Sequence, residues 1–192
     1  MRSAFLFVLN SVLFGVGLAM DAFSVSLANG LQEPNMPARR SLLIAGTFGA
    51  FQTAMPLLGW LCVHTIAETF QAFQRFIPWI ALALLLYIGI SMIVEGLRDD
   101  GSEGKSLHGP ELFMQGVATS IDALSVGFTI AEYDLGFALA ECLIIGAVTF
   151  GLCQIALHLG KKAGARLSGR ATIIGGAILI LIGVEIFVTG VF

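Results

Sequence analysis

The chain has 192 residues, of which 57% are hydrophobic and 12% are charged, and its formal net charge is −3. A soluble domain carries roughly a quarter of charged residues, so this composition argues against a soluble globular domain and for a bundle of membrane spans. The weak net charge gives no indication of a nucleic-acid partner.

The apolar runs are long and do not alternate with a period of two, which favours helices over the strands of a membrane barrel. A helix needs about 20 residues to cross the hydrocarbon layer. Hydropathy predicts six such spans, near residues 4–29, 42–66, 77–97, 111–131, 135–159 and 171–191. We therefore expect an all-α membrane protein with six transmembrane helices.

Asp21 lies deep in the first predicted span, within the apolar segment 19–25. A carboxylate in hydrocarbon is costly, so an intramembrane acid is functional by default. Ser24 follows three residues later and therefore shares a helix face with Asp21. We expect this face to present one carboxylate and one hydroxyl to the bundle interior. The alternative for the serine is a hydrogen bond to a carbonyl of its own helix.

The second and third spans contribute further polar groups. Gln52 offers an amide oxygen, and Pro56 is predicted to kink the second span and free a backbone carbonyl near Gln52. Glu95 lies close to the end of the third span, where a solvated interfacial carboxylate is the simpler interpretation. Residues 98–109 then form a hydrophilic linker.

The fourth span repeats the polar pattern of the first. Asp122 and Ser125 lie in the segment 120–126 at the same spacing as Asp21 and Ser24, so they too share a helix face. The two aspartates have no basic residue beside them. Together they indicate a site for a cation.

The fifth and sixth spans contain three polar residues of interest. Gln154 is the counterpart of Gln52, and Glu141 lies near the outer end of the fifth span, where we expect it to be solvated. Glu185 lies roughly midway along the sixth span. It is a third metal ligand, a proton carrier, or a protonated residue facing the bundle, because burial favours the neutral form of a carboxyl group.

The Lys and Arg residues are distributed unevenly between the two sides of the membrane. One side holds two of them, Arg2 and Arg75. The other side holds eight, namely Arg39, Arg40, Arg98, Lys105, Lys161, Lys162, Arg166 and Arg170. The positive-inside rule places the side with eight in the cytoplasm and both termini outside.

The two halves of the chain, residues 1–97 and 110–192, resemble each other beyond the aspartate segments. Residues 47–52 resemble 149–154, and residues 88–96 resemble 182–190. Because each half has three spans, the second half enters the membrane from the opposite side. The halves are thus predicted to be inverted three-helix repeats, whose sites lie near the midplane where the repeats meet.

The predicted site consists of hard oxygen donors, which suit Mn²⁺, Mg²⁺ or Ca²⁺ better than a soft ion. The candidate metal ligands are Asp21, Asp122, Ser24, Ser125, Gln52 and Gln154. Glu95 and Glu185 are candidates for proton coupling or an accessory role. No HExxH, GxSxG or catalytic triad is present, so we expect neither an enzyme nor a resident cofactor.

Four segments, 20–23, 55–60, 92–96 and 119–127, together resemble the MntP family of bacterial manganese efflux pumps, within the LysE transporter superfamily. The resemblance covers nearly the whole chain. It implies export of Mn²⁺ across the inner membrane, and roles for Asp21, Asp122 and Glu95. Glu185 departs from the family pattern, in which a neutral residue is usual.

The expected mechanism is alternating access, with Mn²⁺ held by the two aspartates and released when they are protonated from outside. The expected partners are the metal and the lipid bilayer; the oligomeric state is not indicated. Two other transport functions stay open, export of another divalent cation such as cadmium and export of a cationic amino acid. A scaffold subunit is the remaining alternative, although a scaffold would not need matched aspartates.

Overall fold

The chain is helical in the parts that the computed structural model describes, residues 2–74, 77–98, 109–167 and 171–191. This confirms the all-α expectation. Seven helices are described: α1 (Arg2–Gln32), α2 (Ala38–Gln74), α3 (Ile77–Arg98), α4 (Gly109–Ala118), α5 (Ile121–Thr129), α6 (Leu135–Leu167) and α7 (Ala171–Val191).

Three helices have apolar stretches long enough to cross a bilayer, namely Leu6–Gln32 in α1, Ala38–Cys62 in α2 and Leu135–Gly164 in α6. Shorter apolar stretches, Leu85–Val94 and Ile173–Glu185, lie in α3 and α7. Large apolar side chains are exposed along most of the helices. Such a surface is unfavourable in water and suits lipid. The protein is therefore a multi-pass helical membrane protein.

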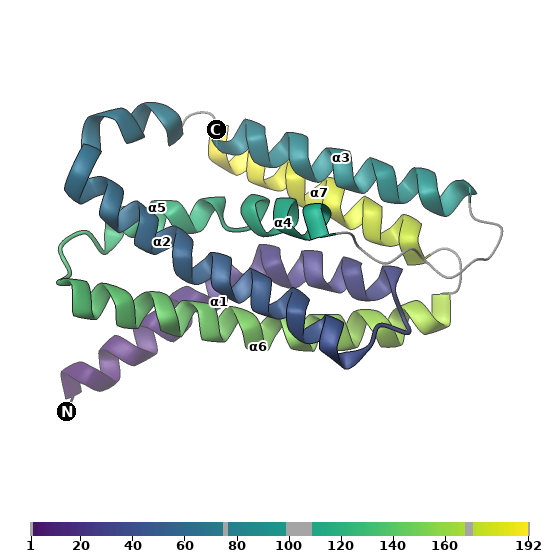
Figure 1. Cartoon of the computed structure of the whole chain (residues 1–192), viewed down its shortest axis with the longest axis horizontal. Helices are drawn as coiled ribbons and strands as arrows, with labels where there is room; N and C mark the ends of the chain where they lie inside the picture. Colours follow the sequence, from purple (N-terminus) through teal and green to yellow (C-terminus); the bar gives the residue numbers. More distant parts are fainter. Residues whose placement is uncertain (1, 75–76, 99–108, 168–170, 192) are drawn as a thin grey trace.

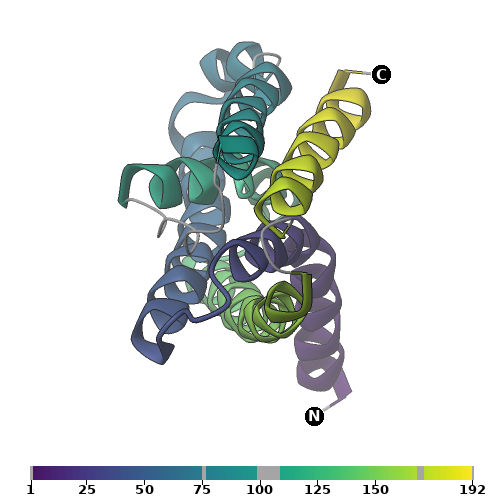
Figure 2. The same ribbon diagram turned by 90° about the vertical axis from the view of Figure 1, so that its right-hand side faces the viewer.

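The helices run back and forth along one long axis (Figure 1). The ends of α1, α3 and α6 lie toward one end of the molecule, as do the starts of α2 and α7, whereas α4 begins nearer the middle (Figure 1). The N-terminus and the α5–α6 turn lie toward the other end. Seen along the axis, α3 and α7 occupy the upper half of the bundle and α1 and α6 the lower half (Figure 2).

The contacts between helices come in matching sets. α1 packs on α6 as α2 packs on α5, and α1 contacts α7 as α3 contacts α4. The α2–α6 and α3–α7 contacts each join helices that hold the same place in the two halves of the chain. Exchanging the two halves therefore leaves the larger contacts unchanged, whereas the small α1–α2 and α6–α7 contacts have no counterpart of similar size among the described helices.

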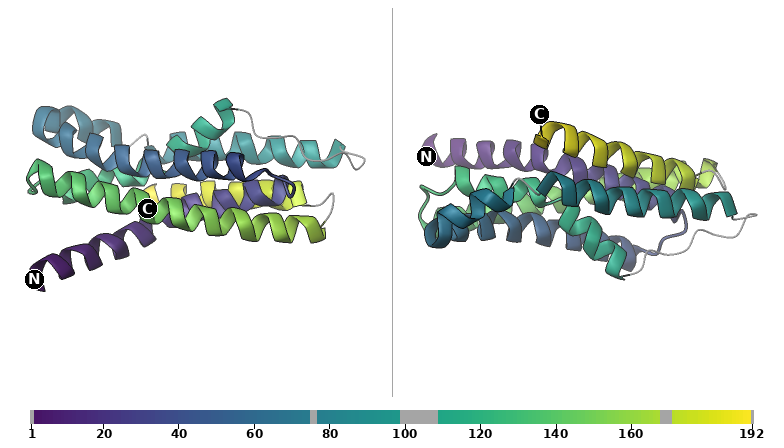
Figure 3. Two further views of the ribbon diagram at one scale, coloured as in Figure 1. Left: turned by 60° about the horizontal axis from the view of Figure 1, so that its bottom comes forward. Right: turned by 90° about the horizontal axis from the view of Figure 1, so that it is seen from above.

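The fourth predicted span is not one helix, which corrects the sequence-based expectation for residues 111–131. It is divided into α4 and α5 at Thr119 and Ser120. Figure 3 shows α4 leaving the line of α5 at an angle. In contrast, α1 is helical throughout and passes Asp21 without a break, although the N-terminal part of α1 diverges from the bundle (Figure 3).

Hydrogen bonds at the break differ from those of a continuous helix. The Ser120 N–H donates to the Val117 carbonyl, three residues earlier, at 3.2 Å, and a carboxylate oxygen of Asp122 accepts the Ala123 N–H at 2.8 Å. Ser, Thr and Asp are the residues that offer the backbone such alternatives. An acid in the first turn also favours a new helix start, because helix N-termini attract negative charge.

Two helices extend beyond the predicted spans. α2 continues to Gln74 and α6 to Leu167, past the predicted ends near residues 66 and 159. A helix does not have to stop where hydropathy falls, because its polar end is solvated in the interfacial layer. α2 contains Pro56, as expected for a bent span, and changes direction along its length (Figure 1).

Glycines let helix backbones approach closely at two corresponding places. Gly30 of α1 faces Gly160 of α6, and Gly59 of α2 faces Gly127 of α5. A Cβ atom on any of these four residues would meet backbone atoms of the facing helix. Small residues at such contacts are the usual means of packing helices in lipid.

We expect Gly59→Ala to destabilise the protein by about 1–3 kcal/mol, because the new methyl group would meet the Leu124 carbonyl of α5. Gly46→Ala, also in α2, is the matched control because no atom lies within 4 Å of its Cβ position. The measurement is the midpoint of thermal unfolding in detergent. Equal midpoints for the two variants would contradict the close α2–α5 contact.

Candidate functional site

Asp21 and Asp122, here called the aspartate pair, come from different halves of the chain. Asp21 lies inside α1, and Asp122 lies in the first turn of α5, directly after the break. Their carboxylates are close enough for Asp21 to repel the charge of Asp122. The tertiary structure therefore brings together two acids separated by about half of the chain.

Asp122 is accessible to a water-sized probe but is closely surrounded by protein that displaces bulk water. Its carboxylate accepts backbone hydrogen bonds at the start of α5, from the N–H of Ala123 at 2.8 Å and from that of Asp122 itself. The positive end of the α5 dipole adds to this stabilisation. The carboxylate is thus held in place by its own helix and stays open to a ligand.

Glu185 of α7 is an exposed acid whose negative charge acts on Asp21. Within the described residues, no three His, Cys, Asp or Glu side chains are grouped tightly enough to hold one metal ion. An ion bound by the aspartate pair would therefore need neutral oxygen ligands as well.

The hydroxyls of Ser24 and Ser125 are available for that purpose. Both serines lie one turn after an aspartate. Among the hydrogen bonds of the described residues, neither hydroxyl donates to a carbonyl of its own helix, which was the alternative expected from the sequence. Other hydroxyls in the bundle do make this bond to the carbonyl four residues earlier: Ser11, Thr47, Thr53, Thr119 and Thr149.

Gln52 of α2 is fully buried beside α1. Its amide nitrogen donates to the Leu18 carbonyl at 2.8 Å, one turn before Asp21. Its amide oxygen is buried and, among the described atoms, has no hydrogen-bond partner. Burial of an unpaired acceptor is costly. Gln52 is therefore fixed next to the aspartate pair with an oxygen that a cation can use.

Gln154 occupies a different environment from its counterpart. Its amide nitrogen donates to the Ser41 carbonyl at 3.1 Å, and its amide oxygen accepts the Ser41 hydroxyl at 3.2 Å. Both ends of the amide are thus engaged with α2. Gln154 therefore links α6 to α2, and its hydrogen bonds are not directed at the aspartate pair.

Two other glutamates, Glu95 and Glu141, lie in α3 and α6. Glu95 lies in α3, but its side chain falls outside the described residues. Glu141 of α6 is only 6% exposed, and one of its carboxylate oxygens is buried without a described partner. The expectation that Glu141 is solvated at the outer membrane surface was therefore wrong, because neighbouring helices cover it.

The structure reveals polar residues that the sequence pattern did not single out. Ser120 lies in the break, two residues before Asp122, and its hydroxyl is buried without a described partner. Asn29 and Gln115 form a buried amide pair between α1 and α4. Ser120 belongs to the aspartate segment, so its position was a signal; nothing in the sequence linked Asn29 to Gln115.

The arrangement can hold a small, hard cation. Two acidic groups supply negative charge, and the nearby hydroxyl and amide oxygens supply neutral ligands. Two carboxylates balance a dication, which lowers the cost of keeping it in surroundings of low dielectric constant.

The amino-acid sequence is similar to those of known proteins. A family model described as "Putative manganese efflux pump" (Mntp) matches residues 35–187. A relative from Clostridium botulinum (strain Hall), named "Putative manganese efflux pump MntP 2", is 38% identical over 194 residues, covering 94% of both chains. One from Methanothermobacter thermautotrophicus, named "Putative manganese efflux pump MntP", is 40% identical over 184 residues, covering 96% of this chain and 97% of the relative. No solved structure matches the chain.

We expect Asp21→Asn to raise the free energy of unfolding of the metal-free protein by about 0.5–2 kcal/mol. This is the usual range for a single stabilising substitution. Asp21 is repelled by both Asp122 and Glu185, and the substitution removes both repulsions. Thermal unfolding at mildly alkaline pH with a chelator measures the effect. Glu132→Gln, which removes an exposed acid, is the control. A lower midpoint for Asp21→Asn would contradict the repulsion.

Proposed function

The chain belongs to the Mntp family of manganese efflux pumps, and from this premise we propose that it exports Mn²⁺ from the cytoplasm through a site at Asp21 and Asp122. The observation that carries the proposal is the aspartate pair itself. Each carboxylate comes from a different half of the chain, and the two repel each other in the absence of a cation. A dication bound between the two carboxylates attracts both of them and outweighs their mutual repulsion.

The neutral ligands of the proposed site are oxygens of Ser24, Ser125 and Gln52. Support comes from the free hydroxyls of the serines and from the buried, unpaired amide oxygen of Gln52. Carboxylate, hydroxyl and amide oxygens are hard donors, which suit Mn²⁺ and not soft ions. Gln154 is left out of the ligand set because Ser41 engages its amide.

We propose that the two halves, 1–97 and 110–192, are inverted repeats that rock against each other, with the linker 98–109 between them. The matching sets of helix contacts support this, as do the corresponding glycine contacts Gly30–Gly160 and Gly59–Gly127. Transporters built from inverted repeats bind their substrates where the repeats meet, often at a discontinuous helix. The break before Asp122 is such a discontinuity.

The proposed orientation places the start of α2 and the ends of α3 and α6 in the cytoplasm. It rests on the excess of Lys and Arg on that side. Both chain termini are then outside. The membrane is proposed to be the cytoplasmic membrane, since export from the cytoplasm requires it.

Export of Mn²⁺ needs an energy source. Moving a dication outward against an inward-negative potential costs about 4.6 kcal/mol per 100 mV, twice the value for a single charge. Proton antiport meets this cost. Protonation of the aspartate pair from outside releases the metal and leaves an uncharged site for the return step. We assign proton exchange with Asp21 to Glu185, because the charge of Glu185 acts on Asp21.

Asp21→Asn and Asp122→Asn are each expected to lower the initial rate of Mn²⁺ uptake into inverted vesicles at least a hundredfold. The reason is that the bound dication would lose one of its two charged ligands, and removing one partner of a buried ion pair costs about 3–5 kcal/mol. Radioactive Mn²⁺ gives the rate. Glu132→Gln, at an exposed position, should transport normally. Parental rates in either aspartate variant, at equal amounts of inserted protein, would rule out the site.

The coupling proposal predicts that an acidic vesicle lumen drives Mn²⁺ accumulation and that an ionophore which collapses the proton gradient abolishes it. Glu185→Gln is expected to retain Mn²⁺ exchange and to lose gradient-driven accumulation, because a glutamine cannot carry the proton. The measurement is steady-state Mn²⁺ content with and without the gradient. Identical contents in the parental protein would show that protons are not the coupling ion.

A further inference from the structure

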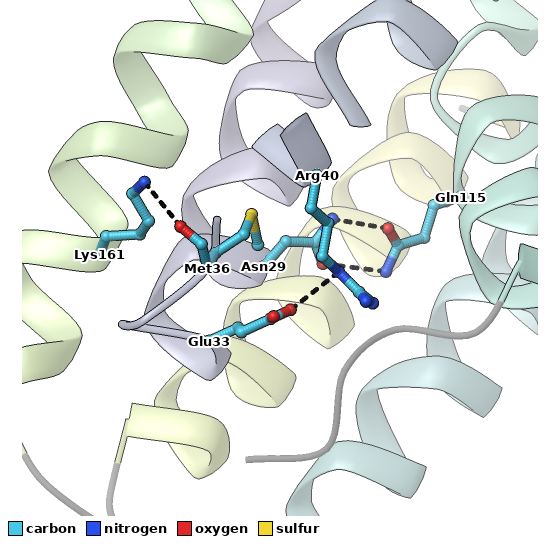
Figure 4. A network of polar contacts seen from close by, with 6 residues as sticks. All are labelled: Asn29, Glu33, Met36, Arg40, Gln115 and Lys161. Carbon is cyan, nitrogen blue, oxygen red and sulfur yellow. Dashed lines mark hydrogen bonds and ion pairs between the residues drawn. The ribbon is translucent and has the colours of Figure 1, made fainter. Parts of the chain in front are cut away.

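A pair of buried amides joins the same two membrane segments that carry the aspartate pair. Asn29 of α1 donates to the Gln115 side-chain oxygen of α4 at 2.7 Å, and Gln115 donates back to the Asn29 oxygen at 3.1 Å (Figure 4). Both side chains have no exposed surface. The two bonds cross from one half of the chain to the other.

The amide pair lies between the aspartate pair and one end of the bundle. Asn29 is eight residues beyond Asp21 in α1, which is about 12 Å along a helix axis. Gln115 precedes the break, whereas Asp122 follows it. The end of α1 and the start of α4 both lie on the side of the molecule toward which α3 and α6 end (Figure 1). The amides therefore fill the contact between α1 and α4 on the way from that side to the aspartates.

A second layer of polar contacts covers the amide pair on its outer side (Figure 4). Glu33 forms an ion pair with Arg40 at 3.0 Å, which connects the end of α1 to the start of α2. Lys161 of α6 donates to the Met36 carbonyl at 3.2 Å. Burial raises the pKa of Glu33, and the charges of Arg40 and Lys161 oppose this rise. The layer is thus partly withdrawn from water.

We propose that Asn29 and Gln115 are the cytoplasmic gate of the transporter, with the Glu33–Arg40 ion pair and Lys161 as its outer layer. The inference rests on the proposed function and orientation. In this structure the gate is closed. The aspartate pair is loaded from the cytoplasm only after the two amides separate.

Amides are suited to a gate that must open repeatedly. A neutral hydrogen bond has a small net worth because its groups exchange partners with water when they separate. An apolar plug would instead expose hydrocarbon surface to water each time it opened. Once apart, both amides present carbonyl oxygens to the entering cation. Those oxygens are ligands of the hard type that the proposed substrate prefers.

The break at Thr119 and Ser120 supplies the hinge for this gate. α5 is held against α2 by the close approach of Gly59 and Gly127, so Asp122 keeps its place. α4 lies on the other side of the break and is inclined to α5 (Figure 3). Swinging α4 would separate Gln115 from Asn29 without moving the helix that carries Asp122. Hinges of this kind are short, irregular segments at the ends of elements.

Reversible cross-linking tests the gate in the full-length protein. Asn29→Cys and Gln115→Cys are combined in a background with Cys62, Cys142 and Cys153 replaced, and Mn²⁺ uptake into inverted vesicles is measured. We expect oxidation, or a short dithiol-reactive cross-linker, to reduce uptake to the background rate, and a reductant to restore it. The same treatment should not change the Mn²⁺ uptake rate of either single-cysteine variant, because one cysteine cannot form the cross-link.

The outcomes separate the gate from the transport function. If the cysteine-free parent does not transport Mn²⁺, the proposed function fails. If the parent transports and the cross-linked protein transports equally well, the gate is wrong and the function stands. If the two cysteines cannot be cross-linked, the contact between α1 and α4 is absent and the gate is again wrong.

Exchanging the two amides gives a test without a cross-link. Asn29→Gln combined with Gln115→Asn keeps both functional groups and the total side-chain volume, so a Ser24→Cys reporter in this variant should react with the thiol reagent as slowly as in the parent. Asn29→Ala should raise the reaction rate of a Ser24→Cys reporter with an impermeant thiol reagent on the cytoplasmic side about tenfold, because two buried hydrogen bonds no longer favour the closed state. No increase would overturn the gate.

Discussion

The repulsion between Asp21 and Asp122 is the constraint on which the rest of the structure depends. Two carboxylates within a membrane bundle disfavour the folded state unless a cation or a proton is present. The helices tolerate the pair because packing elsewhere is tight, at glycine contacts such as Gly59–Gly127. The same repulsion makes the site responsive, since binding a dication or protonating the acids each removes it. Binding and release are thus opposite responses of one electrostatic arrangement.

The two halves of the molecule use their aspartates differently. Asp21 lies in an unbroken helix, whereas Asp122 opens a short helix after a break. The Ala123 N–H and the α5 dipole favour the negative charge of Asp122, and Asp21 has no contact of this type among those described. A matched pair of acids is therefore placed in unequal surroundings.

The break before Asp122 connects the site to the amide pair. A continuous helix would move Gln115 and Asp122 together as a rigid body. Two short helices allow one end to rearrange while the other stays packed, which is the property that alternating access requires of at least one element. At the break, the side chains of Thr119 and Asp122 bond to the backbone, and Asp122 is also a proposed ligand.

The sequence by itself determined the class of fold, the pairing of Asp21 with Asp122 and the face shared with each following serine. These follow from hydropathy and helical periodicity, which are local properties of the chain. It did not separate Gln52 from Gln154, because the two residues occupy equivalent places in repeated segments. Only the tertiary structure decided that one faces α1 with a free oxygen and the other is engaged by Ser41. The break at Thr119, the burial of Glu141 and the Asn29–Gln115 pair were likewise decided there. These features depend on which groups of neighbouring helices lie close enough to pack or to form hydrogen bonds. The spacing of residues along one helix does not specify those neighbours.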